Sequence, residues 1–200
     1  MDNVVFDLGG VILKDRSVTV LNKLTLTKNE YQELSKFFDD FKSLDVGCIN
    51  LEEKFYKCNF SKDIEDKYKD FLLNYYSKRE IDLNLINLID RLKREGHHVY
   101  ILSDNNYEAI RYYKNLDYFK NIDGWVASCE YGTVKRDGKL FQIFLDKYKL
   151  NSNDCYFIDD RRENIEIAKE YGFKTFKYED NYNKLINELK KNKILSEKKV

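Results

Sequence analysis

Residues 155–164 read CYFIDDRREN, a short apolar run that leads directly into two adjacent aspartates. The letters YFI are typical of a buried strand, so Asp159 and Asp160 stand where a strand leaves the core. Neighbouring carboxylates repel each other, and removing either from water costs several kcal/mol unless a cation or hydrogen-bond donors compensate. The stretch therefore predicts a positive partner at the end of this strand.

The same arrangement of a short apolar run followed by polar residues occurs elsewhere in the chain. Similar runs cover residues 4–6, 99–102, 124–127 and, less regularly, 174–177. Patterns typical of amphipathic helices lie at residues 83–92, 141–148 and 165–171, with a last helix ending at about Asn192. Strands that alternate with helices predict an α/β fold with a parallel sheet and right-handed crossovers.

The first two strand runs are separated by far more than the roughly 30 residues of a βαβ unit. The excess, residues 14–79, carries helical patterns and begins with a candidate capping box formed by Thr27 and Glu30. Its aromatic stripes are interpreted mainly as packing between helices. We therefore predict a helical cap inserted into a core formed by residues 1–13 and 80–200.

Composition narrows the class of protein. Lys and Arg together number 35, as do Asp and Glu, so we expect neither a nucleic acid nor a membrane partner. The 4 cysteines include no C-x-x-C pair, which favours reduced thiols packed as small apolar groups over a structural zinc site. The sequence has no run of 18 apolar residues, so we expect a cytoplasmic protein. We expect it to be a monomer or a homodimer.

Polar side chains follow several of the predicted strands. Asp7, Ser103 and the pair Asp159 and Asp160 all stand at carboxyl ends of strands. Open parallel sheets bind ligands at that edge, so residues far apart in the sequence can converge in one crevice. Lys135, between the third and fourth strand runs, provides a cation.

These residues lie in four segments that resemble, in order, the four motifs of the haloacid dehalogenase-like hydrolase superfamily. The segments are VVFDLGGVI (4–12), YILSDNN (100–106), YGTVKRDGKLF (131–141) and YFIDDRRENIEIAKEYGF (156–173). The resemblance extends over about residues 1–178, because VGCINLEEKF (46–55) is similar to a stretch in helical caps of this superfamily. It implies a phosphatase of the helical-cap type (subfamily IA-like), with a Rossmann-like core of strand order 3-2-1-4-5.

The resemblance also implies catalytic roles. Asp7 would attack phosphorus and form an aspartyl-phosphate, which water would then hydrolyse. Mg²⁺ would be held by Asp7, Asp160 and the main-chain carbonyl of Gly9, with Asp159 bound directly or through water. Hard carboxylate oxygens suit Mg²⁺, and no histidine lies in the four motifs, which argues against zinc.

Further residues would bind phosphate or support the metal ligands. The implied phosphate-binding set contains Ser103, Asp104, Lys135 and the backbone amides of the turn at Gly10. Lys135 would also counter the clustered carboxylates, and Asn164 would hydrogen-bond to the metal ligands.

Three positions depart from the family pattern. Gly9 stands where many phosphatases of the superfamily carry the aspartate that protonates the leaving oxygen; Asp15, Glu52 and Glu53 are candidate replacements. Asp104 replaces a frequent asparagine and would repel phosphate unless it points away or is paired by Arg136 or Arg161. Arg136 itself replaces a proline.

The leading hypothesis is a Mg²⁺-dependent phosphatase of a small phosphorylated metabolite, such as a sugar phosphate. The alternative is a catalytically weakened phosphate-binding or regulatory protein, which would explain Gly9 and Asp104. A dehalogenase needs no metal, so the pair at 159–160 counts against it. A receiver domain places its acidic pair before the phosphoacceptor, and the order here is the reverse. The substrate stays open.

Overall fold

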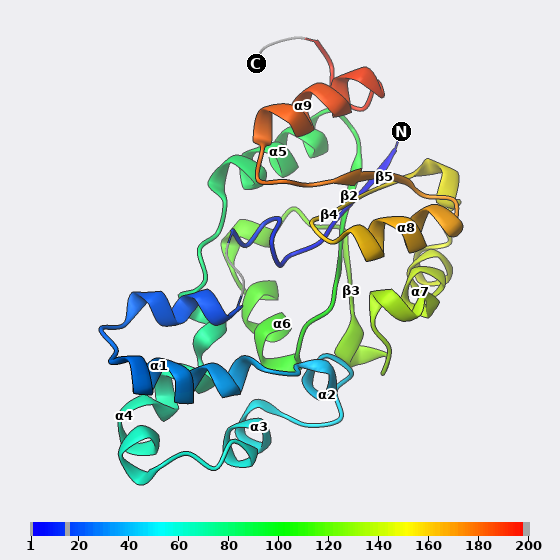
Figure 1. Ribbon diagram of the computed structural model, residues 1–200. Coiled ribbons are helices and arrows are strands. Elements are labelled where there is room, and N and C mark those ends of the chain that lie inside the picture. The colour runs from blue at the N-terminus through cyan, green and yellow to red at the C-terminus, as the bar shows by residue number, and fades with distance from the viewer. Residues whose placement is uncertain (1, 15–16, 198–200) are drawn as a thin grey trace.

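A five-stranded parallel sheet forms the centre of the computed structural model, which describes residues 2–14 and 17–197 (Figure 1). The strands are β1 (Asn3–Phe6), β2 (His98–Ser103), β3 (Gly124–Ala127), β4 (Cys155–Asp159) and β5 (Lys174–Lys177). Their order is β3-β2-β1-β4-β5, and all neighbours are parallel. The predicted α/β fold and the implied strand order are both confirmed.

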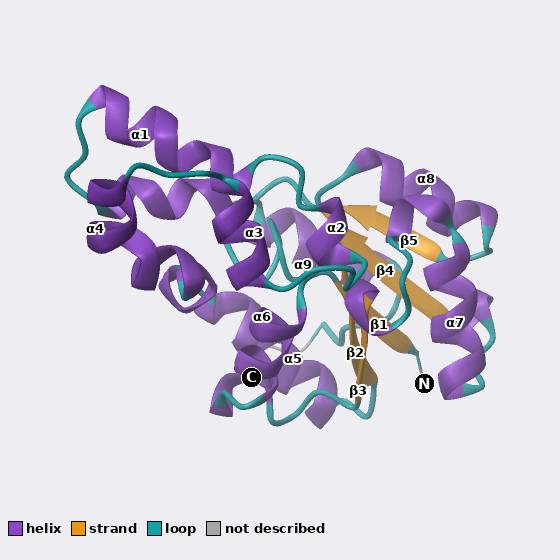
Figure 2. Ribbon diagram, turned by 90° about the horizontal axis from the view of Figure 1, so that it is seen from below, coloured by secondary structure: helices purple, strands orange, loops and turns teal. Residues whose placement is uncertain are grey.

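Helices cover both faces of the sheet (Figure 2). One face packs against α5 (Leu83–Arg94), α6 (Tyr107–Lys114) and α9 (Tyr182–Lys191). The other packs against α7 (Lys139–Tyr148) and α8 (Arg162–Glu170). The sequence predicted all of these except α6, which begins where the Asn106 side chain accepts a hydrogen bond from the amide of Ala109.

The chain between β1 and α5 is helical. It contains α1 (Lys28–Ser35), α2 (Lys42–Asp45), α3 (Leu51–Lys57), α4 (Lys62–Leu73) and 3-10 helices at Ser17–Lys23, Lys36–Phe38 and Tyr75–Lys78. Both views show α1, α3 and α4 away from the sheet, whereas α2 lies near it (Figures 1 and 2). The predicted capping box of Thr27 and Glu30 begins α1, and an unpredicted one, Asn50 with Glu53, begins α3.

This helical segment buries an apolar cluster of its own, separate from the two clusters that flank the sheet. Phe37, Phe55 and Leu72 are fully buried in it. The aromatic stripes therefore do pack between helices, although Phe38 and Phe41 stay partly exposed beside Tyr75.

The sheet register brings the polar ends of β1 and β4 to one level. Phe6 is aligned with Ile158, and the amide of Asp7 donates to the carbonyl of Ile158 at 2.9 Å. Side chains alternate along a strand, so Asp7 follows Val5, and Asp159 follows Phe157, toward the face that α7 and α8 cover. Two carboxylates from opposite ends of the chain thus leave the sheet side by side.

All four cysteines are free. Cys129 and Cys155 are buried in the two clusters beside the sheet, as predicted for small apolar groups. Cys48 is exposed, because it lies in the turn after α2. Within residues 2–14 and 17–197, no helix has both the length and the apolar character needed to cross a bilayer.

Candidate active site at the carboxyl edge of the sheet

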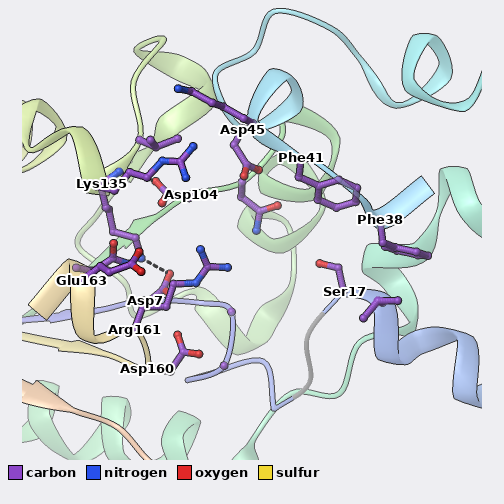
Figure 3. A pocket seen from close by; sticks show the side chains of 18 of the residues that line it. Asp7, Ser17, Phe38, Phe41, Asp45, Asp104, Lys135, Asp160, Arg161 and Glu163 are labelled. Atoms are coloured by element: carbon purple, nitrogen blue, oxygen red, sulfur yellow. Dashed lines mark hydrogen bonds and ion pairs between the residues drawn. The ribbon is translucent and has the colours of Figure 1, made fainter. Parts of the chain in front are cut away.

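A cavity of about 410 Å³ lies at the carboxyl edge of the sheet, a volume typical of small-molecule sites (Figure 3). The loops after the strands contribute one part of its wall, and the helical segment contributes the other. The first group includes Asp7, Gly9, Gly10, Asp104, Lys135, Asp160, Arg161 and Asn164, and the second includes Ser17, Phe38, Phe41, Asp45 and Tyr75.

Three carboxylates converge beside this cavity. Asp7, Asp159 and Asp160 each offer an oxygen atom, and these atoms lie within 4.8 Å of one another. Asp7 is 5% exposed and Asp159 is fully buried. Burial raises the pKa of Asp7 to about 7, and the charges of Asp159 and Asp160 add to this, while Lys135 opposes it. A charged Asp7 is therefore unfavourable in this cluster unless a cation offsets it.

Lys135 enters the cluster from a 3-10 helix, Lys135–Asp137, that precedes α7. Its Nζ lies 2.6 Å from Oδ2 of Asp159 and 2.9 Å from Oδ1 of Asp7, and the side chain is 1% exposed. Burial alone would lower the pKa of Lys135, but the Asp159 and Asp7 carboxylates outweigh it and raise the pKa. The ammonium is therefore charged, and it pairs with two carboxylates at once. Figure 3 shows its ion pair with Asp7.

Asp159 is held on both oxygens. Oδ1 accepts from the amide of Arg161 at 2.7 Å and from Nδ2 of Asn164 at 3.1 Å. Oδ2 accepts from Lys135 and again from Asn164, at 3.0 Å. Asp159 thus has its hydrogen-bonding capacity filled by the protein itself.

Asp160 is the opposite case. Its Oδ1 is buried and accepts no hydrogen bond from any residue that the structure describes. Burial, followed by the charge of Asp159, raises the pKa of Asp160. A buried oxygen without a donor is costly unless something else satisfies it, and a divalent cation beside Asp7 would do so. The residues present therefore fit a hard cation such as Mg²⁺.

Gly10 gives Asp160 the room that this position requires. Its φ of +76° is a left-handed conformation, and a Cβ there would come within 2.5 Å of Oδ2 of Asp160. The turn after β1 thus approaches the carboxylate so closely that a side chain would displace it.

We expect Gly10→Ala to destabilise the fold by about 1–2 kcal/mol through left-handed strain, and also to weaken Mg²⁺ binding by displacing Asp160. Gly96→Ala is the matched control, because Gly96 has a φ of +89° and its Cβ would meet no atom within 4 Å. Urea unfolding and Mg²⁺ calorimetry measure the two effects. Equal Mg²⁺ affinity in both variants would contradict the role assigned to Gly10.

The residues after β2 are placed differently from one another. Ser103 is 1% exposed, and its Oγ has no hydrogen-bond partner among the described residues, but it does not line the cavity. Asp104 does line it, and its Oδ1 accepts from the backbone amide of Lys135 at 2.9 Å. Burial raises the pKa of Asp104. A main-chain donor, rather than Arg136 or Arg161, is thus its hydrogen-bond partner.

Sequence reasoning did not identify which residues of the helical segment line the cavity. Asp45 of α2 and the aromatic side chains of Phe38 and Phe41 line the cavity, whereas Glu52 and Glu53 do not. Glu53 instead accepts from the amide of Asn50 in the capping box. A usable signal was present, because Asp45 directly precedes the segment VGCINLEEKF that resembles helical caps. The remaining candidate acid, residue 15, lies outside the described residues.

Gly9 also lines the cavity and carries no group that could donate a proton. A Cβ there would lie 3.6 Å from Nη2 of Arg79, which is ordinary van der Waals contact. The space beside Gly9 is therefore bounded by a guanidinium group, supplied from the end of the helical segment.

Comparisons with known proteins agree with this geometry. A model of the haloacid dehalogenase-like hydrolase family matches residues 1–172. The D-ribitol-5-phosphate phosphatase of Bacteroides thetaiotaomicron is 28% identical over 199 aligned residues, covering 89% of this chain and 92% of that protein.

Two solved structures show the shared fold. A haloacid dehalogenase family enzyme of Bacteroides thetaiotaomicron, in complex with magnesium and inorganic phosphate, superposes with a TM-score of 0.71 at 22% identity, over 92% of this chain and 98% of that one. The L-2-haloacid dehalogenase of Xanthobacter autotrophicus superposes with a TM-score of 0.65 at 13% identity, over 98% and 85%. Since the family model spans most of the sequence and the four motifs meet at one edge of the sheet, this chain belongs to the haloacid dehalogenase-like hydrolase family.

Proposed function

We propose that the protein is a Mg²⁺-dependent phosphatase that acts on a small phosphorylated sugar or polyol through an aspartyl-phosphate on Asp7. The observation that carries the proposal is the convergence of Asp7, Asp160 and Lys135 at one cavity of about 410 Å³. It is supported by the relative that acts on D-ribitol 5-phosphate and by the structural neighbour that holds magnesium and inorganic phosphate.

Asp7 and Asp160 are the proposed direct ligands of the cation, together with the main-chain carbonyl of Gly9. A bound Mg²⁺ would neutralise negative charge where the nucleophile meets the phosphate. Asp159 has its oxygens occupied by protein donors, so we assign it to positioning Lys135 rather than to direct metal contact. Asn164 holds Asp159 in turn.

Phosphate would be received by donors around Asp7. The amides of the turn through Gly10, the hydroxyl of Ser103 and the ammonium of Lys135 are the proposed donors. The Ser103 hydroxyl has no other partner among the described residues, which agrees with a role toward ligand. Asp104 is assigned to orienting the loop of Lys135, because its carboxylate accepts from that residue's amide.

Residues 14–79 are proposed to act as a cap that selects the substrate and excludes water. The described part of this segment has its own apolar cluster, and its aromatic residues Phe38, Phe41 and Tyr75 form one side of the cavity. The ring of Tyr75 lies 5.4 Å from that of Phe38 and 5.8 Å from that of Phe41. Such a wall suits the carbon chain of a sugar or polyol.

The test is a screen of phosphorylated sugars and polyols, including D-ribitol 5-phosphate, with 4-nitrophenyl phosphate as a reactive ester. Phosphate release should require Mg²⁺ and stop when the ion is chelated. A weakened binding protein is the second candidate, because Gly9 supplies no acid. Calorimetry would then show Mg²⁺-dependent binding of phosphate esters that are not turned over.

We expect the thermal stabilisation caused by millimolar Mg²⁺ to be larger at about pH 8 than at about pH 5.5. Metal binding requires deprotonated carboxylates, and the pKa of Asp7 is raised to about 7. Without the ion, the folded state holds this proton more tightly than the unfolded chain does. The stability from that group is therefore present at low pH and is lost as pH rises through about 7.

Asp160→Asn is the variant for this experiment, because the amide removes one proposed ligand without changing the size of the side chain. It should abolish most of the Mg²⁺-dependent shift in melting temperature at either pH. An undiminished shift would show that the cation binds elsewhere.

A further inference from the structure

Hydrolysis of an alkyl phosphate needs a proton for the leaving oxygen, because an alkoxide is a poor leaving group. Gly9 carries no such proton, although it lines the cavity. A residue that supplies this proton is needed only if the protein is a phosphatase, so its identification rests on the function proposed above.

Six carboxylic acids line the cavity within the described part of the chain: Asp7, Asp40, Asp45, Asp104, Asp160 and Glu163. Asp7 and Asp160 belong to the nucleophile and cation site. The Asp104 carboxylate accepts a hydrogen bond from the backbone amide of Lys135. Asp40 and Glu163 are exposed to solvent rather than enclosed in the site. Asp45 is the acid that these assignments leave over.

Asp45 is positioned by the helical segment. It is the last residue of α2, and its amide donates to the carbonyl of Phe41 at 2.8 Å, which fixes its backbone beside the cavity. Figure 3 shows Asp45 across the cavity from Asp160, with its carboxyl group turned toward the interior. The Lys135 ammonium is paired with Asp7 and Asp159 rather than with Asp45.

The surroundings of Asp45 favour its protonated form. Burial raises its pKa to about 7, and the charges of Asp104 and Asp7 add to this, while Arg161 and Lys135 oppose it. The neutral groups that interact with Asp45 from neighbouring elements are Tyr75 and Cys129. An acid of this kind carries a proton near neutral pH and can release it, as a general acid must.

We propose that Asp45 is the general acid of the reaction and that the helical segment, rather than the loop after β1, supplies it. As Asp7 forms its bond to phosphorus, the bond from phosphorus to the leaving oxygen breaks, and that oxygen takes the proton of Asp45. The products are an alcohol, the aspartyl-phosphate and an ionised Asp45. Water then attacks phosphorus and gives one proton to Asp45. The bond between phosphorus and Asp7 breaks, phosphate is released, and both aspartates return to their starting states.

This assignment makes the helical segment part of the chemistry. A loop residue at position 9 would move with the sheet, but Asp45 reaches the leaving oxygen only when α2 lies over the cavity. Asp45 therefore protonates the leaving oxygen of substrates that let the segment close. Water alone in the cavity does not hold the segment in that position. Substrate selection and catalysis would depend on one helix.

The experiment compares Asp45→Asn with the wild type on two kinds of ester. For alkyl phosphates, including D-ribitol 5-phosphate, kcat should fall about 10²- to 10³-fold, the range that general acids contribute. For 4-nitrophenyl phosphate the leaving group needs no proton, so kcat should change by less than about 5-fold. Preserved turnover of this ester also shows that the variant is folded.

Asp39→Asn is the matched control, because Asp39 is an exposed carboxylate of the same segment that does not line the cavity. It should behave as the wild type on both esters. An equal loss on both esters in Asp45→Asn, or no loss on either, would overturn the assignment of Asp45. So would a wild type that hydrolyses 4-nitrophenyl phosphate but no alkyl phosphate. If the wild type hydrolyses neither ester, the proposed phosphatase function itself fails.

Discussion

Asp7→Asn should reduce kcat for every phosphate ester by about 10⁴-fold or more, because it removes the proposed nucleophile. The asparagine has the same size, so Lys135 keeps its partner Asp159, and the side-chain oxygen at position 7 can still accept from the amide of Leu8. The loss should therefore appear with 4-nitrophenyl phosphate as well as with alkyl phosphates. This pattern differs from that expected for Asp45→Asn, in which kcat for 4-nitrophenyl phosphate is nearly unchanged.

The same substitution should not destabilise the protein without Mg²⁺ at about pH 8. Burial holds the pKa of Asp7 near 7, so a charged carboxylate is unfavourable there, and the neutral amide removes that penalty. Turnover and thermal melting are measured on the same preparation. Asp146→Asn serves as the control, because Asp146 is exposed on α7.

A covalent intermediate gives the decisive readout for Asp7. Acid quenching during turnover, followed by mass spectrometry, should find one phosphoryl group on the peptide that contains residue 7, and none in Asp7→Asn. Residual activity within about 10-fold of the wild type would rule out this residue as the nucleophile.

Much of the core was predictable because it depends on local patterns. The apolar runs at 4–6, 99–102 and 156–158 became neighbouring strands. Alternation along the strands then decided which polar ends share a face. The convergence of Asp7 with Asp159 and Asp160 followed from a general rule, that parallel strands present their carboxyl ends at one edge.

The side chains around the cluster were harder to predict, because their partners are set by packing between distant segments. Lys135 was expected to bind phosphate and to counter the carboxylates, but its complete burial between Asp7 and Asp159 is a property of the folded chain. The same holds for Asp104, whose partner is a backbone amide that no side-chain pattern reveals.

The wall formed by the helical segment was the least predictable part of the site. Helical spacing identified Phe38 and Phe41 as apolar positions, yet it could not tell the face that packs against other helices from the face toward the cavity. Asp45 lies in a helix of four residues, Lys42–Asp45, which is too short to leave a periodic signal. Its position over the cavity depends on how the whole segment packs.

Lys135→Met is expected to have the largest effect on stability, about 3–5 kcal/mol at about pH 8. The methionine keeps an unbranched apolar side chain over Phe157, whose ring lies 5.7 Å from Nζ of Lys135, but it leaves Asp7 and Asp159 without their counter-charge. Removing one member of a buried ion pair strands the other in a medium that solvates charge poorly. Urea unfolding measures this loss directly.

The loss should depend on pH in a definite direction. Without the ammonium, the pKa of Asp7 rises further in the folded state, so the folded carboxyl binds its proton more tightly than the unfolded one. The variant should therefore be close to the wild type at about pH 5, and the difference should grow as pH rises through about 7. Adding Asp159→Asn to Lys135→Met should restore part of the stability, since one stranded charge is gone.

Lys139→Met is the control for this pair of measurements, because Lys139 is exposed at the start of α7 and should tolerate the same change within about 0.5 kcal/mol. If Lys135→Met were no less stable than this control at about pH 8, Asp7 and Asp159 would have another counter-charge. Lys135 would then not be the group that stabilises the ionised form of Asp7. A loss that is the same at every pH would instead mean that packing over Phe157, and not charge, is what Lys135 contributes.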